Sequence, residues 1–264
     1  MVKTLTMEKI IEITNELKPN DKDDFKNIKQ IMEAMDEDLC RLLFDIEFSN
    51  ILTSPWKIEA QTESGTHLAH YIQNIVISDM VSILFRIWDN SNDVNSLYLA
   101  STILNKNRIL KEFIINCYPC EGITPAQAKQ IIEQVPHAHK HKLLQHIKAY
   151  RTERIGHNLQ NKSVQTELFV GDMLKLGSIM IYADLTLKYA SNFSNIVLGK
   201  IINYSKFPAK SNYEMALEEL KNLLSSKGFL SNAGIRLKPL EYIDDGGLAK
   251  QILQDLKIDK DLFL

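Results

Sequence analysis

The fold is decided by residues 67–89, which read HLAHYIQNIVISDMVSILFRIWD. Apolar side chains recur through this stretch at separations of three and four, which is the period of an α-helix. The run from 71 to 88 is interrupted by four polar or charged residues: Gln73, Asn74, Asp79 and Arg86. A bilayer core does not readily accept such groups, so we expect a helix packed inside a soluble protein and no membrane span.

Helical periodicity also dominates the chain on both sides of this stretch. Thr124 followed by Pro125 is typical of a helix start, and Pro136 predicts that the same helix ends there. We find no alternating strand of useful length. We therefore expect an all-α fold with an N-terminal helical extension, a helical bundle as its core and a small C-terminal helical appendage, spanning 1–60, 61–206 and 207–264.

Composition limits the compartment and the class of partner. Of the 264 residues, 45% are hydrophobic and only 10 are Gly and 7 Pro, so the chain can form a sizeable core. The formal net charge of −2 provides no global field that would attract nucleic acid, so an RNA-binding role needs a local basic patch. Three cysteines and an N-terminus without an apolar signal segment predict a cytoplasmic protein.

The segment 149–158, AYRTERIGHN, is the most informative for function. It places Arg151, Arg154 and His157 within seven residues at the end of a predicted helix. A guanidinium group holds phosphate through paired donors, and an imidazole can transfer a proton near neutral pH. Together they suit cleavage of a phosphodiester without a metal. The alternative is a solvent-exposed helix end whose cations complement the helix dipole.

Arg151, five residues and then His157 resemble the Arg-(four to six residues)-His signature of the HEPN superfamily. The fuller pattern Tyr-Arg-x-x-Arg-Ile-Gly-His is similar to the abortive-infection type-U branch, in which the motif follows a long helix such as the one predicted at 67–89. The segment 94–104 also resembles that branch, and the similarity covers about residues 60 to 205 in pieces.

The resemblance implies an all-α bundle that forms a homodimer and cleaves RNA without a metal, as a toxin or a phage-defence effector. Arg151 would then hold the scissile phosphate and His157 would transfer a proton in a cleft shared by two subunits. An antitoxin or other regulatory partner is also implied. Thr152 and Leu159 depart from the residues that members often carry there, and Leu159 replaces a tyrosine that a partner enzyme modifies in some members.

Helix geometry leaves the choice between the two arginines open. Positions 151 and 157 are about 120° apart around an ideal helix, whereas Arg154 and His157 are three residues apart and share a face. Asn158 shares a face with both arginines and is a candidate for orienting the substrate.

The long helix carries a second polar set, formed by Asp79, Arg86 and Asp89. Their spacing places them on one stripe of an otherwise apolar helix, from which an aspartate would orient the motif arginines. The alternative is that Arg86 pairs within its own helix, with Asp89 or Asn90.

A metal site is the runner-up interpretation of the chemistry. Cys117 and Cys120 form a Cys-x2-Cys pair, and His137 and His139 follow. Thiolate and imidazole ligands suit tetrahedral zinc, but the histidine spacing departs from that of zinc fingers. We favour two unpaired thiols and expect no cofactor. The leading hypothesis is a homodimeric, metal-independent endoribonuclease, and the alternative is a non-catalytic RNA- or protein-binding module of the same fold.

Overall fold

The computed structural model describes residues 15–53, 63–91, 94–117, 123–151, 176–199, 202–209 and 211–226. Every regular element in these ranges is a helix, so the all-α prediction is confirmed. The helices are α2 (Pro19–Ala34), α3 (Asp36–Thr53), α4 (Glu63–Ile87), α5 (Leu97–Lys106), α6 (Arg108–Cys117), α7 (Pro125–His139), α8 (Lys142–Tyr150), α9 (Leu176–Leu198) and α10 (Asn212–Ser226). Within the described residues, none of these helices combines the length and the apolar character needed to cross a bilayer.

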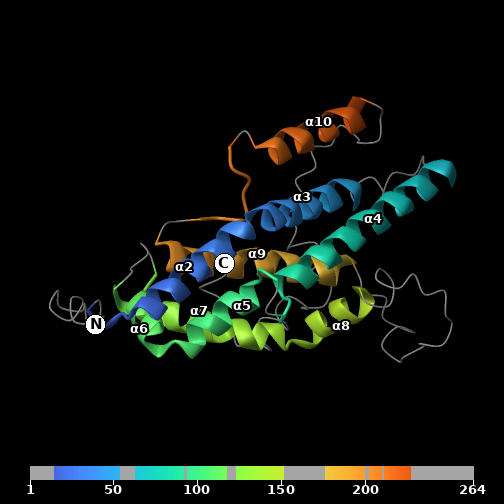
Figure 1. Ribbon diagram of the computed structural model, residues 1–264. Coiled ribbons are helices and arrows are strands. Elements are labelled where there is room, and N and C mark those ends of the chain that lie inside the picture. The colour runs from blue at the N-terminus through green and yellow to red at the C-terminus, as the bar shows by residue number, and fades with distance from the viewer. Residues whose placement is uncertain are drawn as a thin grey trace.

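Helix α9 is the central element of the bundle (Figure 1). It contacts α2, α3, α4, α6, α7 and α8. Its aromatic residues Tyr182, Tyr189 and Phe193 are almost fully buried. A helix that is apolar around most of its circumference has to be enclosed by others, which explains its place in the middle. Residues 152–175, which precede α9 in the chain, lie outside the described ranges.

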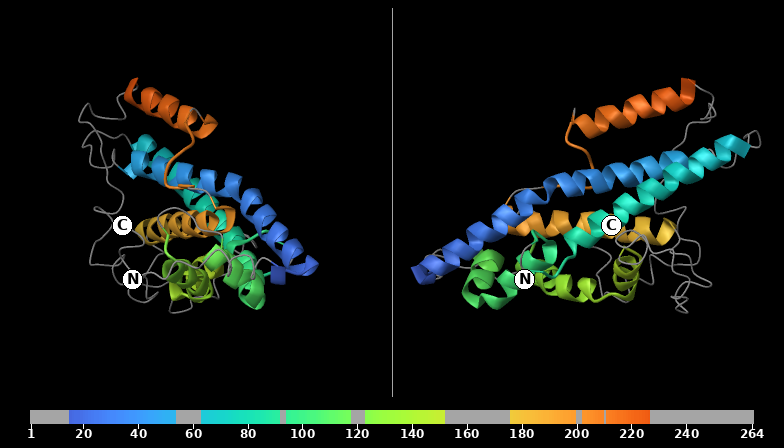
Figure 2. Two further views of the ribbon diagram at one scale, coloured as in Figure 1. Left: turned by 90° about the vertical axis from the view of Figure 1, so that its left-hand side faces the viewer. Right: turned by 45° about the vertical axis from the view of Figure 1, so that its right-hand side comes forward.

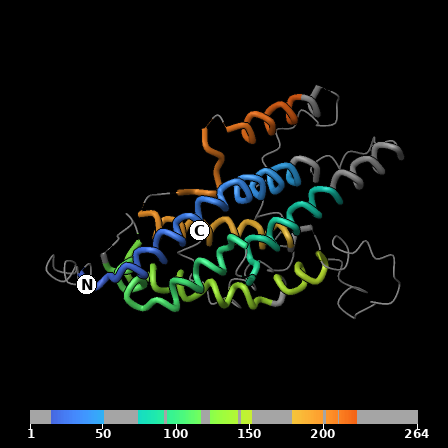
Figure 3. Tube along the Cα trace, viewed as in Figure 1, coloured from blue at the N-terminus to red at the C-terminus, as the bar shows by residue number. Residues whose placement is uncertain are grey.

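Helices α2 and α3 follow one another along a similar direction, with a break at Met35 (Figure 3). Both lie within the predicted N-terminal extension, yet Ile28 of α2 and Leu39 of α3 belong to the same hydrophobic core as α4 to α9. Helix α3 makes its most extensive contact with α4. This pairing brings charged side chains of the two helices together along one seam.

Helix α10 lies on the outer side of α3, away from the rest of the bundle, in both views of Figure 2. Tyr213 connects α10 to α3. Its hydroxyl donates a hydrogen bond to the Glu37 carboxylate, and the centroids of the Tyr213 and Phe44 rings are 5.8 Å apart. Leu217 is buried, but most other described side chains of α10 are exposed. This helix therefore covers the outer face of α3.

Helix α7 confirms one sequence prediction and corrects another. The Thr124 hydroxyl accepts the backbone N–H of Gln127, and Pro125 occupies the first turn, as expected for a helix start. The predicted end at Pro136 is wrong, because α7 continues through it to His139. A proline in a helix leaves the carbonyl four residues earlier without its usual donor. Here that carbonyl, of Ile132, accepts hydrogen bonds from Ser101 and Asn105 of α5, each at 3.3 Å.

Candidate functional site

Arg151 is the member of the predicted catalytic motif that the structure describes. It follows α8 directly, in a single π-turn, and is half-buried. Its guanidinium carbon lies 4.5 Å from the centre of the Phe85 ring on α4. Stacking of this kind fixes the plane of the guanidinium while its N–H groups still point outward at the edge, where they can bind an anion. Arg154, His157 and Asn158 lie outside the described residues.

A buried polar cluster lies one turn before Arg151, where α4, α7 and α8 meet. The Lys148 ammonium group is 2.9 Å from the backbone oxygen of Trp88 and 2.9 Å from Nε2 of His139. The His139 ring packs against that of Tyr98 at a tilt of 33°, with the ring centroids 4.1 Å apart. Burial and the Lys148 charge lower the pKa of His139 to about 4, so this imidazole is neutral at pH 7. The cluster joins the end of α4 to α7 and α8.

His139 therefore fits poorly as a zinc ligand. A neutral imidazole that accepts a hydrogen bond from an ammonium group at Nε2 has no lone pair left there for a metal. His137 is exposed, while the side chain of Cys117 and the whole of Cys120 lie outside the described residues. Within the ranges that are described, no group of three or more His, Cys, Asp or Glu side chains is placed to hold a metal ion.

Asp89 takes part in the turn that follows α4. Its Oδ1 atom accepts the backbone N–H of Ser91 at 2.8 Å, and its backbone oxygen accepts the Ser96 hydroxyl at 2.7 Å. Ser96 in turn caps α5 by accepting the N–H of Leu99. Burial lowers the pKa of Lys148, and the Asp89 charge offsets part of that lowering. Asp89 thus follows the end of α4 on which Arg151 packs through Phe85.

Asp79 and Arg86 are instead bound to α3. Both oxygens of Asp79 accept from Arg41, at 2.6 and 2.8 Å. Both oxygens of Asp38 accept from Arg86, at 3.0 and 2.5 Å. The alternative in which Arg86 pairs within its own helix is not what the structure shows, because its partner lies 48 positions earlier in the chain. Two bidentate ion pairs thus join α3 to α4, one with its arginine on α3 and the other with its arginine on α4.

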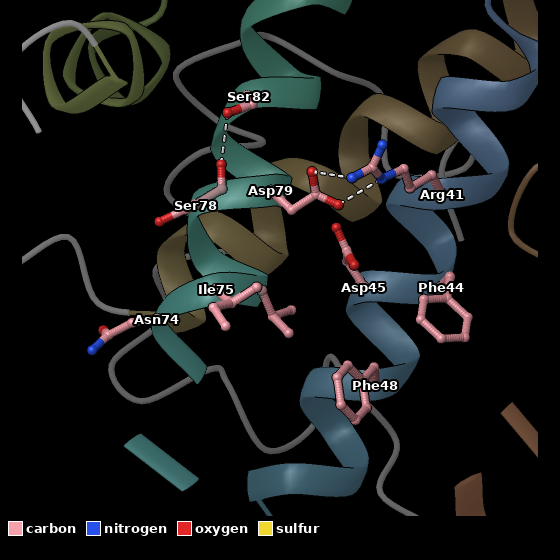
Figure 4. Close-up of a pocket in the computed structure, with 10 residues that line it drawn as sticks. Arg41, Phe44, Asp45, Phe48, Asn74, Ile75, Ser78, Asp79 and Ser82 are labelled. Atoms are coloured by element: carbon pink, nitrogen blue, oxygen red, sulfur yellow. Dashed lines mark hydrogen bonds and ion pairs between the residues drawn. The ribbon is translucent and has the colours of Figure 1, made fainter. Parts of the chain in front are cut away.

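An acidic residue that the sequence analysis missed lies next to the Arg41–Asp79 pair. Asp45 of α3 is 5% exposed, and its carboxyl group points toward that of Asp79 (Figure 4). Its Oδ2 atom meets no hydrogen-bond donor among the described residues. Two carboxyl groups in contact can form a hydrogen bond only when one of them is protonated. Burial, followed by the Asp79 charge and that hydrogen bond, raises the pKa of Asp45 to about 8.

Asp45 also lines an open cleft between α3 and α4 with a volume of about 540 Å³. Polar groups at one side of it include Arg41 and Asp79, and much of the remaining wall is apolar (Figure 4). The apolar lining residues are Phe44, Phe48, Ile75 and Val76. A sequence signal for this site is hard to find, because Asp45 and Asp79 are 34 positions apart and nothing local marks them as neighbours.

Comparison with known proteins adds no relative: no family model, no curated protein and no solved structure matches this chain.

Proposed function

We propose that this protein is a metal-independent endoribonuclease of a toxin or phage-defence system, which acts as a homodimer in the cytoplasm. The observation that carries the proposal is the position of Arg151, stacked on Phe85 at the junction of α4 and α8. A cation that packs against a core helix is oriented before a substrate arrives. Stabilisation of a charged transition state requires such an oriented group.

The proposed reaction uses side chains of the motif and the ribose of the substrate. The 2′-oxygen attacks the adjacent phosphorus, the bond to the 5′-oxygen breaks, and a 2′,3′-cyclic phosphate remains. His157 takes the proton from the 2′-hydroxyl or gives one to the departing 5′-oxygen. Arg151 or Arg154 binds the non-bridging oxygens, whose negative charge grows as the phosphorane forms.

The test is cleavage of total RNA by the purified protein in excess chelator. We expect His157→Ala to remove most cleavage, and Arg151→Lys to lower it about a hundredfold, because an ammonium group keeps the charge but loses the planar fork. Arg108→Lys is the matched control. The Arg108 side chain is 89% exposed, and it forms an ion pair with Glu112 of its own helix at 3.1 Å. The product should carry a 2′,3′-cyclic phosphate.

The same experiment separates the alternatives. A larger loss with Arg154→Lys than with Arg151→Lys would make Arg154 the main phosphate ligand. Cleavage at the parental rate by all three variants would refute the proposed site. A parent protein that binds RNA but cleaves none would favour the non-catalytic binding module.

Dimer formation is tested separately by light scattering. We expect the mass of two chains, because the proposed cleft needs motif residues from both subunits. A monomer mass that persists in concentrated protein would contradict the shared-cleft proposal.

A further inference from the structure

The cleft between α3 and α4 has the composition of a binding site that is separate from the Arg151 motif. Its volume of about 540 Å³ is in the range of pockets that enclose small molecules. Such pockets combine apolar walls with a few polar groups that orient the ligand. In this cleft the apolar side chains come from both helices, the charged groups Arg41, Asp45 and Asp79 lie together at one side, and the uncharged polar residues Asn74, Ser78 and Ser82 come from α4 (Figure 4).

The charges in the cleft leave one negative group without a counterion. The Arg41 guanidinium occupies both oxygens of Asp79, so that pair is neutral as a unit. Asp45 is only 5% exposed, and its Oδ2 atom has no hydrogen-bond donor among the described residues. When Asp45 is ionised, the cleft therefore carries a single uncompensated negative charge at a buried carboxylate, which is costly without a cation.

The apolar part of the cleft extends to the surface beside this carboxylate. Ile75, in the middle of α4, is 52% exposed, so a large aliphatic side chain is open to solvent here. Phe44 and Phe48, both on α3, pack on one another along the same wall of the cleft, with ring centroids 5.9 Å apart. These three side chains would cover the hydrocarbon body of a ligand whose charged end reaches Asp45.

We propose that this cleft binds a small organic monoamine with an apolar body, whose ammonium group forms an ion pair with Asp45 while the body packs against Phe44, Phe48 and Ile75. A primary ammonium carries one charge and donates up to three hydrogen bonds, so it matches one carboxylate with an open oxygen. A divalent ion fits less well, because it takes six or more oxygen ligands and both oxygens of Asp79 are already bound by Arg41.

Binding of an amine competes with the proton that Asp45 and Asp79 share. The charged groups acting on Asp45 are Asp79 from α4 and Arg41 from its own helix. Helix α9, which packs on both, carries Asp184 and Lys188, which pair at 3.3 Å and do not line the cleft. From α10, Tyr213 approaches Phe44. Amine affinity should therefore rise with pH as Asp45 loses its proton.

The experiment is calorimetric titration of the full chain with benzylamine, with benzyl alcohol as the neutral probe of the same shape. At pH 8.5 we expect benzylamine to bind at least tenfold more tightly than benzyl alcohol, and its affinity to fall between pH 8.5 and pH 6. Asp45→Asn should reduce benzylamine binding to the level of the alcohol. Ile75→Gln, at an exposed position, should weaken it severalfold without a change in helix content.

Asp38→Asn is the control for charge removal, because Asp38 belongs to the Arg86 ion pair and does not line the cleft. Binding by this variant should equal that of the parent. The proposal is overturned if the alcohol binds as tightly as the amine, if Asp45→Asn binds the amine like the parent, or if neither probe binds at millimolar concentration. Displacement of benzylamine by magnesium ions would also overturn it, in favour of a metal site. None of these results bears on RNA cleavage, so this proposal and the ribonuclease proposal fail independently.

Discussion

Asp45 of α3 and His139 of α7 pack against different parts of the same long helix, α4, and differ in the direction of their pKa shifts. Asp45 lies against the middle of α4 and has a pKa raised to about 8. His139 lies where α4 ends, at Trp88, and has a pKa lowered to about 4. In each case burial is the largest cause, and a neighbour of like charge adds to it: Asp79 for Asp45, and Lys148 for His139.

The two groups therefore reach the same charge state at pH 7, since each is held neutral by desolvation. Their surroundings differ. His139 is enclosed by Tyr98 and Lys148, whereas Asp45 lines an open cleft with an apolar wall. An enclosed neutral group acts as a structural contact. A neutral acid beside a cleft can exchange its proton for a cation from solution.

The largest expected effect is the pH dependence that Asp45 gives to the free energy of unfolding. The Asp45 pKa is higher in the folded than in the unfolded chain, so the folded state binds more protons between about pH 4 and pH 8. Stability falls as pH rises through that window, by roughly 6 kcal/mol, since each pKa unit corresponds to about 1.4 kcal/mol. Asp45→Asn should remove this loss, leaving the variant much more stable than the parent at pH 9 and more stable by a smaller margin at pH 5. Urea unfolding at both pH values measures it, and an unchanged pH profile would contradict a protonated Asp45.

His139 should give the opposite slope. Its pKa is lower in the folded than in the unfolded chain, so the unfolded state binds more protons between about pH 6.5 and pH 4. Stability is lost as pH falls through that window, by about 3 kcal/mol. His139→Gln keeps an acceptor for Lys148 but does not titrate, so its unfolding midpoint should change less between pH 7 and pH 4. An equal acid slope in parent and variant would assign the loss to other groups.

A smaller effect distinguishes burial from charge at the His139 end. Lys148→Met removes the positive charge 2.9 Å from Nε2, so the pKa of His139 should rise from about 4 but stay below its ordinary value. The lost hydrogen bond to Trp88 should cost on the order of 1 kcal/mol. Titration of the His139 ring signals by NMR measures the pKa. A pKa that does not move would leave burial and the Lys140 charge as the causes.

The smallest effect concerns the ion pair between Asp38 of α3 and Arg86 of α4. The Asp38 and Arg86 side chains are 27% and 43% exposed, so solvent screens their attraction. Asp38→Asn should cost less than about 1 kcal/mol, and high salt should reduce the difference from the parent. Chemical unfolding at low and high salt tests this. A loss several times larger would mean that the register of α3 against α4 depends on this pair.

Local patterns in the sequence were sufficient for the elements but not for the contacts between them. The period of residues 67–89 predicted most of α4, and Thr124–Pro125 predicted the start of α7. Pro136 misled, because the carbonyl that it leaves open is satisfied by α5, more than 25 positions earlier. The Arg86–Asp38 pair and the burial of Asp45 likewise arise from the packing of α3 on α4, which no short window of sequence contains.

The central position of α9 has a consequence for synthesis on the ribosome. The chain is made from its N-terminus, so α2 to α8 emerge before Leu176, the first residue of α9. Until then the inner faces of α3, α4 and α7 lack the helix on which they pack, and their apolar side chains remain open to solvent or to chaperones. The core therefore closes late, when the nascent chain has grown beyond residue 198 and α9 enters the bundle.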